Sequence, residues 1–292
     1  MQGRLDDVEG RCRAVAGQCP AGILLRMEFG AVVASVSNDA GGWTAHIPAD
    51  WGNGRTVFGG LQAALLVRGM RGVLGGSRSL PLRSLHVTFV APIAAGQDVG
   101  LRPELLRTGK SVAHARCDLY SRDGLGCTAV AIFGADRPSA VSLEIPRAEV
   151  ETDLRQLPEF PYVPGVTPEF VQHLQMRIGR GSLPYSGQKD ARTTIFARLR
   201  DPDCAPEDAL IALADSIPTP ALSMLTRPAP AASLNWMLEL LGHPADLDLN
   251  AWVIIDTSVR AGSDGYLSQT STLWGPSGHA FSISHQSVAI FG

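Results

Sequence analysis

A pentapeptide that occurs twice is the feature that most constrains the fold. Val-Ala-Ile-Phe-Gly stands at residues 130–134 and again at residues 288–292. A repeat of roughly 150 residues is much longer than the units of about 20–50 residues that stack into solenoids. The sequence therefore predicts two copies of one domain in a single chain, and we expect one copy to keep the polar groups of a site.

Length and composition fit this arrangement and exclude some functions. The 292 residues suffice for two domains of ordinary size. A net charge of -3 argues against a general nucleic-acid-binding protein, which would carry a basic face. The cysteines are odd in number and lack metal-ligand spacing, so they predict reduced structural thiols and no metal site. They are Cys12, Cys19, Cys117, Cys127 and Cys204.

The N-terminal segment predicts no export or membrane insertion. Residues 1–12 are acidic and polar, whereas a signal peptide has a basic and then an apolar run. No stretch approaches the roughly 20 apolar residues that span a bilayer. We expect a cytoplasmic protein that does not enter the membrane.

The first half has the pattern of an antiparallel sheet with one buried helix. Residues 61–70 are almost wholly apolar, which predicts a helix buried on nearly all sides, and Gly75 and Gly76 end it. A hairpin turn is predicted at residues 121–124. Strands are predicted at residues 23–27, 31–36, 43–47, 82–91, 99–106, 112–120 and 127–133.

The second half repeats this order after a proline-rich connection. A helix is predicted at residues 206–213, with Asp208 in its first turn and Pro218 beyond its end. Strands are predicted at residues 193–199, 232–240, 252–261, 265–273 and 279–291. Residues 143–154 and 168–178 fit strand or helix equally. The predicted units are an N-terminal domain at residues 1–136, a linker with the start of the second half at 137–190, and a C-terminal domain at 191–292.

These elements resemble the double hotdog fold, an α+β architecture. In it, two fused domains each wrap an antiparallel sheet around a long central helix. The words RTVFGG at residues 55–60 and LRTGKS at residues 106–111 resemble the first half of the acyl-CoA thioesterase II family. The second half resembles it through LAD at residues 213–215, ASL at residues 232–234 and SHQS at residues 284–287.

The resemblance implies hydrolysis of acyl-CoA thioesters, a reaction of fatty acid metabolism, without an acyl-enzyme and without a cofactor. In that family an Asp, a Thr or Ser and a Gln hold the attacking water, and here these are Asp215, Ser233 and Gln286. The family more often has Thr at the position of Ser233, and a Ser hydroxyl offers the same donor and acceptors. The family often has Asp-His where this chain has Asn235-Trp236. A homo-oligomer, a dimer of double hotdogs, is expected by analogy.

The chemistry of these residues agrees with that role. Asp215 follows an apolar run at residues 209–214, so we expect burial to raise its pKa toward a value useful for a base. Gly59 and Gly60 open the first helix and would let a thioester carbonyl approach its backbone N–H groups. Strand alternation predicts that Gln286 faces the helix with Val288.

Other candidates are weaker. Asn235 is expected to share a strand face with Ser233 and line the same pocket. Lys110 and Arg116 could bind CoA phosphates, although a solvated position explains Lys110 equally well. His86 and His285 fit no catalytic pattern and are interpreted as structural.

Two alternative functions stay open. The first is an acyl-thioester binding protein without catalysis. The second is an enoyl-thioester hydratase or dehydratase, which would need a His near the carboxylate. Thr219 and Pro220 stand four and five residues after Asp215, which argues against that reading.

Overall fold

The computed structural model describes residues 27–77, 79–149 and 153–291. The predictions for the N-terminal segment, the strand at residues 23–27 apart from Met27, and Cys12 and Cys19 lie outside the described residues.

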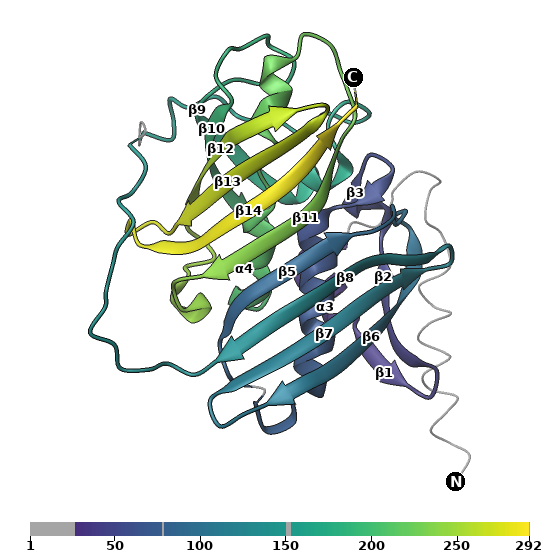
Figure 1. The fold of residues 1–292 in the computed structure, drawn as a ribbon. Coiled ribbons are helices and arrows are strands. Elements are labelled where there is room, and N and C mark those ends of the chain that lie inside the picture. The colour runs from purple at the N-terminus through teal and green to yellow at the C-terminus, as the bar shows by residue number, and fades with distance from the viewer. Residues whose placement is uncertain (1–26, 78, 150–152, 292) are drawn as a thin grey trace.

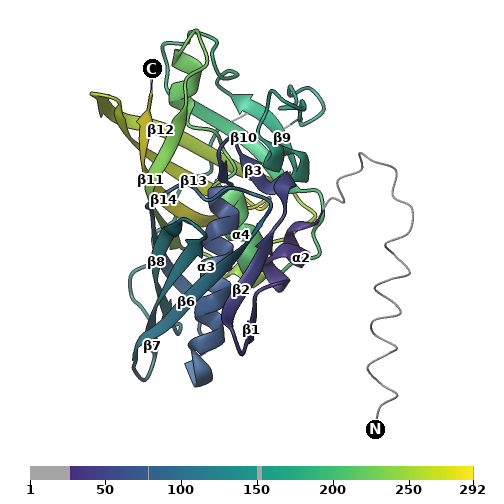
Figure 2. The ribbon, with the colours of Figure 1, turned by 90° about the vertical axis from the view of Figure 1, so that its right-hand side faces the viewer.

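Within these residues, a 12-stranded antiparallel sheet dominates the fold and wraps around two helices (Figures 1 and 2). The first-half strands are β1 (Ser37–Asp39), β2 (Gly42–Ile47), β5 (Leu82–Phe89), β6 (Gln97–Thr108), β7 (Val112–Ser121) and β8 (Gly124–Gly134). The second-half strands are β9 (Leu174–Arg180), β10 (Arg192–Leu199), β11 (Ala231–Leu240), β12 (Val253–Ser263), β13 (Tyr266–Trp274) and β14 (Ala280–Ile290). β3 (Gly52–Asn53) and β4 (Thr56–Val57) form a separate small hairpin.

The described residues form three α-helices, and the two longer ones lie on the concave side of the sheet (Figure 2). The three helices are α2 (Phe29–Ala34), α3 (Gly59–Val73) and α4 (Pro206–Ala214), and the short 3₁₀ turns are η1 (Ala49–Trp51), η2 (Gly75–Ser77), η3 (Glu169–His173), η4 (Pro220–Met224) and η5 (Pro244–Asp246). Gly75 follows α3 with a φ of 56°, the left-handed conformation that commonly ends helices. Within the described residues, no helix is both long and apolar enough to cross a membrane.

The two halves join edge to edge. The strand order is β1-β2-β6-β7-β8-β5-β11-β14-β13-β12-β10-β9, so each half keeps its own strands together. β5 pairs antiparallel with β11, and His86 lies opposite Met237 in that register. This is the double hotdog architecture that the sequence predicts, and the join removes an exposed strand edge from each half.

One predicted strand is wrong. Residues 31–36 lie largely in α2, where Phe29, Val32 and Val33 are buried and Ala31 is exposed. Positions i, i+3 and i+4 share one face of a helix, so this spacing buries one side of α2 against the core. The other strands predicted within the described residues and both long helices were correctly predicted, with ends that differ by up to three residues.

The segment between the halves is ordered where the structure describes it. Its residues 145–149 and 153–157 pack on the outer face of the second half's sheet, where Ile145 and Leu157 join a cluster with Trp274. Arg177 of β9 donates to the backbone oxygens of Leu154 at 2.9 Å and Leu157 at 2.8 Å. β9 itself pairs with β10, so the end of the predicted linker belongs to the sheet.

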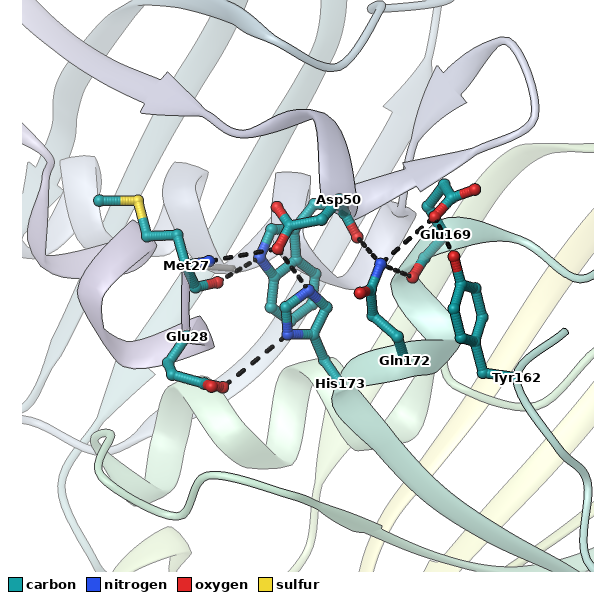
Figure 3. A network of polar contacts seen from close by, with 8 residues as sticks. Met27, Glu28, Asp50, Tyr162, Glu169, Gln172 and His173 are labelled. Atoms are coloured by element: carbon teal, nitrogen blue, oxygen red, sulfur yellow. Dashed lines mark hydrogen bonds and ion pairs between the residues drawn. The ribbon is translucent and has the colours of Figure 1, made fainter. Parts of the chain in front are cut away.

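A polar network ties this segment to the first half (Figure 3). His173 of η3 is 1% exposed and places Nε2 3.1 Å from a carboxylate oxygen of Asp50. Its ring stacks on Trp51 with 4.0 Å between centroids. The Phe58 N–H donates to the Trp51 oxygen at 3.0 Å, and the Phe58 ring stacks on Phe170 at 4.2 Å. Because Phe58 immediately precedes α3, half two fixes the start of the first-half helix.

The described cysteines are free thiols. Burial raises the pKa of Cys117 and of Cys204 to about 12 and also raises that of Cys127. These thiols stay protonated at neutral pH and pack as small apolar groups.

The pairing of β5 with β11 leads to a prediction about stability. Leu238 is 0% exposed and lies opposite Leu85, also 0% exposed, whereas Met237 faces the other side of the sheet and is half-buried. Leu238→Ala should lower the free energy of unfolding by about 2–5 kcal/mol. Met237→Ala is the matched control and should cost clearly less. Urea denaturation measures both, and equal losses would contradict the assignment of faces.

Candidate active site

Asp215 lies where the two halves meet. It caps the C-terminus of α4, and its carboxylate reaches the N-terminus of α3. A Cβ built on Gly59 would lie 2.6 Å from Asp215 Oδ2. Any larger residue at position 59 would therefore displace the carboxylate, so a glycine is required there.

Gly60 brings the helices together at the same point. A Cβ on Gly60 would lie 3.0 Å from the Ala212 Cα and 2.6 Å from the Phe58 ring. The Gly60 backbone N–H interacts with the Asp215 carboxylate. The glycine pair thus permits close packing of the two helices and also exposes backbone N–H donors beside the carboxylate.

Gln286 of β14 completes the surroundings of the carboxylate. Its Nε2 donates to Asp215 Oδ1 at 3.0 Å, and its Oε1 accepts from Gln269 Nε2 of β13 at 2.6 Å. Gln286 faces the helices on the same side as Val288, which is 3% exposed. The predicted orientation of Gln286 agrees with this geometry.

The pKa of Asp215 is raised from 3.8 to about 7. Desolvation is the largest cause, and the hydrogen bonds from Gln286 and Gly60 oppose it. The pKa of Asp215 is therefore shifted in the direction that the sequence predicts. A carboxylate that titrates near neutrality can accept a proton from water and return it.

Ser233 shares the helix-facing side with Gln286. It is half-buried and lies opposite Val288 in the β11–β14 register. Within the described chain, no hydrogen bond joins Ser233 to Asp215 or Gln286. The structure therefore brings Asp215, Gln286, Gly59 and Gly60 into contact and leaves Ser233 nearby on the same face.

The prediction that Asn235 shares a face with Ser233 is wrong. A β-bulge between these residues shifts the register, so Asn235 lies opposite Ser287 rather than on the side of Val288. The extra residue of a bulge breaks the two-residue alternation. Asn235 is exposed on the outer face, where it lines a groove of about 320 Å³ with His86 and His285. Both histidines therefore lie across the sheet from Asp215.

The two candidates for CoA binding also lie away from Asp215. Lys110 is exposed in the β6–β7 hairpin, near the β5 end at which Leu82 pairs with Phe133, whereas Gly59 approaches Phe89 at the opposite end. Across β5 this separation is about 23 Å at about 3.3 Å per residue. The Arg116 guanidinium binds Asp118 through two hydrogen bonds of 3.0 and 2.8 Å. Neither residue belongs to the contact around Asp215.

Gln269 is a residue that the sequence did not single out. It is 2% exposed and lies opposite Gln286. The available signal for its importance was a polar side chain at an inward-facing position of the predicted strand at residues 265–273. Its pairing with Gln286 depends on strand register, which the sequence alone does not define.

A cavity of about 20 Å³, room for roughly one water molecule, lies beside the segment that follows Asp215. It is lined by Phe160, Ile178, Ser182, Pro184, Thr193, Ile195, Pro218, Thr219, Pro220 and Ser223. In the described residues, no three His, Cys, Asp or Glu side chains cluster as metal ligands would.

Solved structures share this fold. A hot dog fold protein of Alicyclobacillus acidocaldarius is 22% identical with a TM-score of 0.79, covering 89% of this chain and 97% of that one. The tesB protein of Mycobacterium avium subsp. paratuberculosis is 16% identical with a TM-score of 0.71, covering 91% and 100%. The acyl-CoA thioesterase II TesB2 of Mycobacterium marinum is 17% identical with a TM-score of 0.64, covering 86% and 92%. At these identities the likeness establishes the fold.

Sequence families give a more specific result. No curated protein sequence matches the chain. The N-terminal domain of acyl-CoA thioesterases matches residues 47–134, and the C-terminal domain matches residues 151–290. These two matches cover most of the chain and both halves of the sheet. The protein belongs to the acyl-CoA thioesterase family of double hotdog proteins.

Proposed function

We propose that this protein hydrolyses acyl-CoA thioesters by direct attack of a water molecule that Asp215 activates. The observation that carries the proposal is the position of the Asp215 carboxylate, between the N-terminus of α3 and the Gln286 amide, with a pKa of about 7. Family membership supports thioester hydrolysis in general, and this contact supports the mechanism.

The proposed reaction has two steps. The water oxygen bonds to the thioester carbonyl carbon while Asp215 takes a proton from that water. The tetrahedral oxyanion then collapses, the C–S bond breaks, and the thiolate of CoA leaves with the proton from Asp215. The products are a free acid and CoA, and no bond to the enzyme forms.

The start of α3 is suited to the oxyanion. The first N–H groups of a helix have no partner within the helix and favour negative charge. In the free protein the Asp215 carboxylate occupies this place. When Asp215 gains the proton, its attraction for the Gly60 N–H falls, and the developing oxyanion is the stronger acceptor.

Gln286 and Ser233 would orient the water. The Gln286 Nε2 holds Asp215 Oδ1 at 3.0 Å and so fixes the direction of the other carboxylate oxygen. Ser233 offers a hydroxyl donor and acceptor from the same side of the sheet.

The alternatives have less support. A hydratase needs a His close to the carboxylate, whereas His86 and His285 lie on the outer face of the sheet. His173 pairs with Asp50 but is 1% exposed and stacked on Trp51. An acyl-thioester binding protein without catalysis would have no use for a carboxylate that titrates near neutrality. The homo-oligomer and the cytoplasmic location stay predictions.

The first prediction from this proposed function concerns activity. The wild type should release CoA thiol from members of an acyl-CoA panel of short, medium, long and aromatic chains. Asp215→Asn removes the base and should lower kcat by about a hundredfold or more. Thiol release measured with a chromogenic disulfide reports both values.

His285→Ala is the matched control for that experiment, because His285 is the neighbour of Gln286 and points to the opposite face. It should keep wild-type activity. Equal activity in wild type and Asp215→Asn would move the site elsewhere, and an inactive wild type that still binds acyl-CoA would favour the binding protein.

A second prediction uses the β-bulge in β11. Ser233→Ala should lower kcat/KM roughly fivefold, as expected for a lost hydrogen bond of about 1 kcal/mol. Asn235→Ala lies on the other face and should leave kcat/KM unchanged. Steady-state kinetics of the two variants compares them directly, and a larger loss in Asn235→Ala would refute this division of faces.

A third prediction concerns stability and pH. The folded pKa of Asp215 is above its ordinary value of 3.8, so its contribution to stability is full below about pH 4 and is lost as the pH rises through about 7. Asp215→Asn stays neutral throughout. Its stability relative to wild type should rise by up to about 4 kcal/mol between pH 4 and pH 8, at about 1.4 kcal/mol per pKa unit. Urea denaturation across this range measures the difference, which would be constant if Asp215 were solvated.

A further inference from the structure

Gln269 has one described side-chain hydrogen bond, and that bond goes to Gln286. Its Nε2 donates to Gln286 Oε1 at 2.6 Å, while its own Oε1 is buried without a hydrogen-bond partner among the described residues. An unpaired buried acceptor costs free energy that an apolar side chain would not. The residue is therefore poorly explained by stability, and its use must lie in its donor.

The donor determines how the Gln286 amide is oriented. An amide has an oxygen that accepts and an NH₂ group that donates, and a rotation by 180° exchanges them. With Gln269 Nε2 bound to Oε1, the Nε2 of Gln286 is directed to Asp215 Oδ1 at 3.0 Å. The reverse orientation would place two amide donors together and an amide oxygen against an ionised carboxylate. The three side chains thus form a directed chain from β13 through β14 to α4.

The other described groups around Asp215 are uncharged, so its protonation depends on this series of hydrogen bonds as well as on desolvation. The pKa of Asp215 responds to desolvation, to Gln286 and to the Gly60 N–H, and among the described residues no charged side chain contributes to it. From α3 the neighbour is Gly59, against which the Phe89 ring of β5 also packs. On β14 the titratable neighbour His285 is exposed on the opposite face. The charged residues of α3, Arg68 and Arg71, act on Asp208 at the other end of α4.

We propose that Gln269 is a positioning residue of the active site. It locks the Gln286 amide in the orientation that donates to Asp215, and so keeps the carboxylate ionised and ready to take a proton from water. The role rests on the proposed function of Asp215 as the base, and Gln269 itself touches neither water nor substrate.

Gln269→Met tests this proposal, because Met is unbranched and close to Gln in size but has no N–H donor. Without the lock, the Gln286 amide rotates freely and donates to Asp215 for only part of the time. The acid limb of the pH profile of kcat/KM should move to higher pH, by about 0.5–1 unit for the loss of one hydrogen bond to a carboxylate. At pH 7 kcat should fall several-fold, KM should stay near wild type, and activity should recover above pH 8.

Ser271→Ala is the matched control. Ser271 lies two residues further along the same strand and face, and its hydroxyl bonds Thr257 at 2.7 Å. This variant loses a buried hydrogen bond but not the chain to Asp215. It should lower the thermal midpoint of unfolding without moving the acid limb, whereas Gln269→Met should move the limb while its thermal midpoint is unchanged or higher.

A direct titration separates this inference from the proposed function. The ¹³C carboxyl resonance of Asp215, assigned by its loss in Asp215→Asn, should titrate at higher pH in Gln269→Met than in wild type. This readout holds even if the wild type hydrolyses no acyl-CoA, an outcome that would overturn the function alone. Identical midpoints in wild type and Gln269→Met, or an equal shift in Ser271→Ala, would overturn the role of Gln269.

Discussion

The close approach of two helix ends is the constraint on which the site depends. The C-terminus of α4 carries Asp215, and the N-terminus of α3 offers backbone N–H groups, but the two meet only because position 59 has no side chain. Between residues 59 and 97 the first half contains no Asp or Glu. The first half therefore supplies the helix start and the second half supplies the acid. Neither half contains the site alone, and the β5–β11 pairing that joins them is part of it.

Burial alone does not make a carboxylate into a base, as a second aspartate in the same helix demonstrates. Desolvation raises the pKa of Asp208 to about 7 as well, but Glu207, Arg68 and Arg71 also act on it. Asp208 thus lies in a charged cluster between helices, where Arg71 pairs with Glu207. Asp215 has amide donors, and no charged residue of the described chain acts on it. Its proton affinity depends on hydrogen bonds that a substrate or a rotated amide can change, which is what reversible proton transfer needs.

The sequence predicted most of the fold and only part of the site, for physical reasons that differ by residue. Long apolar runs and strand alternation located α3, α4 and the strands, because burial imposes those periods. The short helix α2 was missed because Val32 and Val33 suit a strand equally well. Asn235 was misplaced by a bulge that leaves no clear mark in the sequence. Gln269 was missed because its importance depends on lying opposite Gln286, a fact of strand register.

The segment between the halves also supports the site. η3 packs Phe170 on the ring of Phe58, and His173 stacks on Trp51, whose backbone oxygen holds the Phe58 N–H. Phe58 in turn packs against Gly60. The start of α3 is thus held by contacts with both η3 and α4, and both come from beyond residue 137. A helix end held by two packed elements keeps its N–H groups aligned with the carboxylate before any substrate binds.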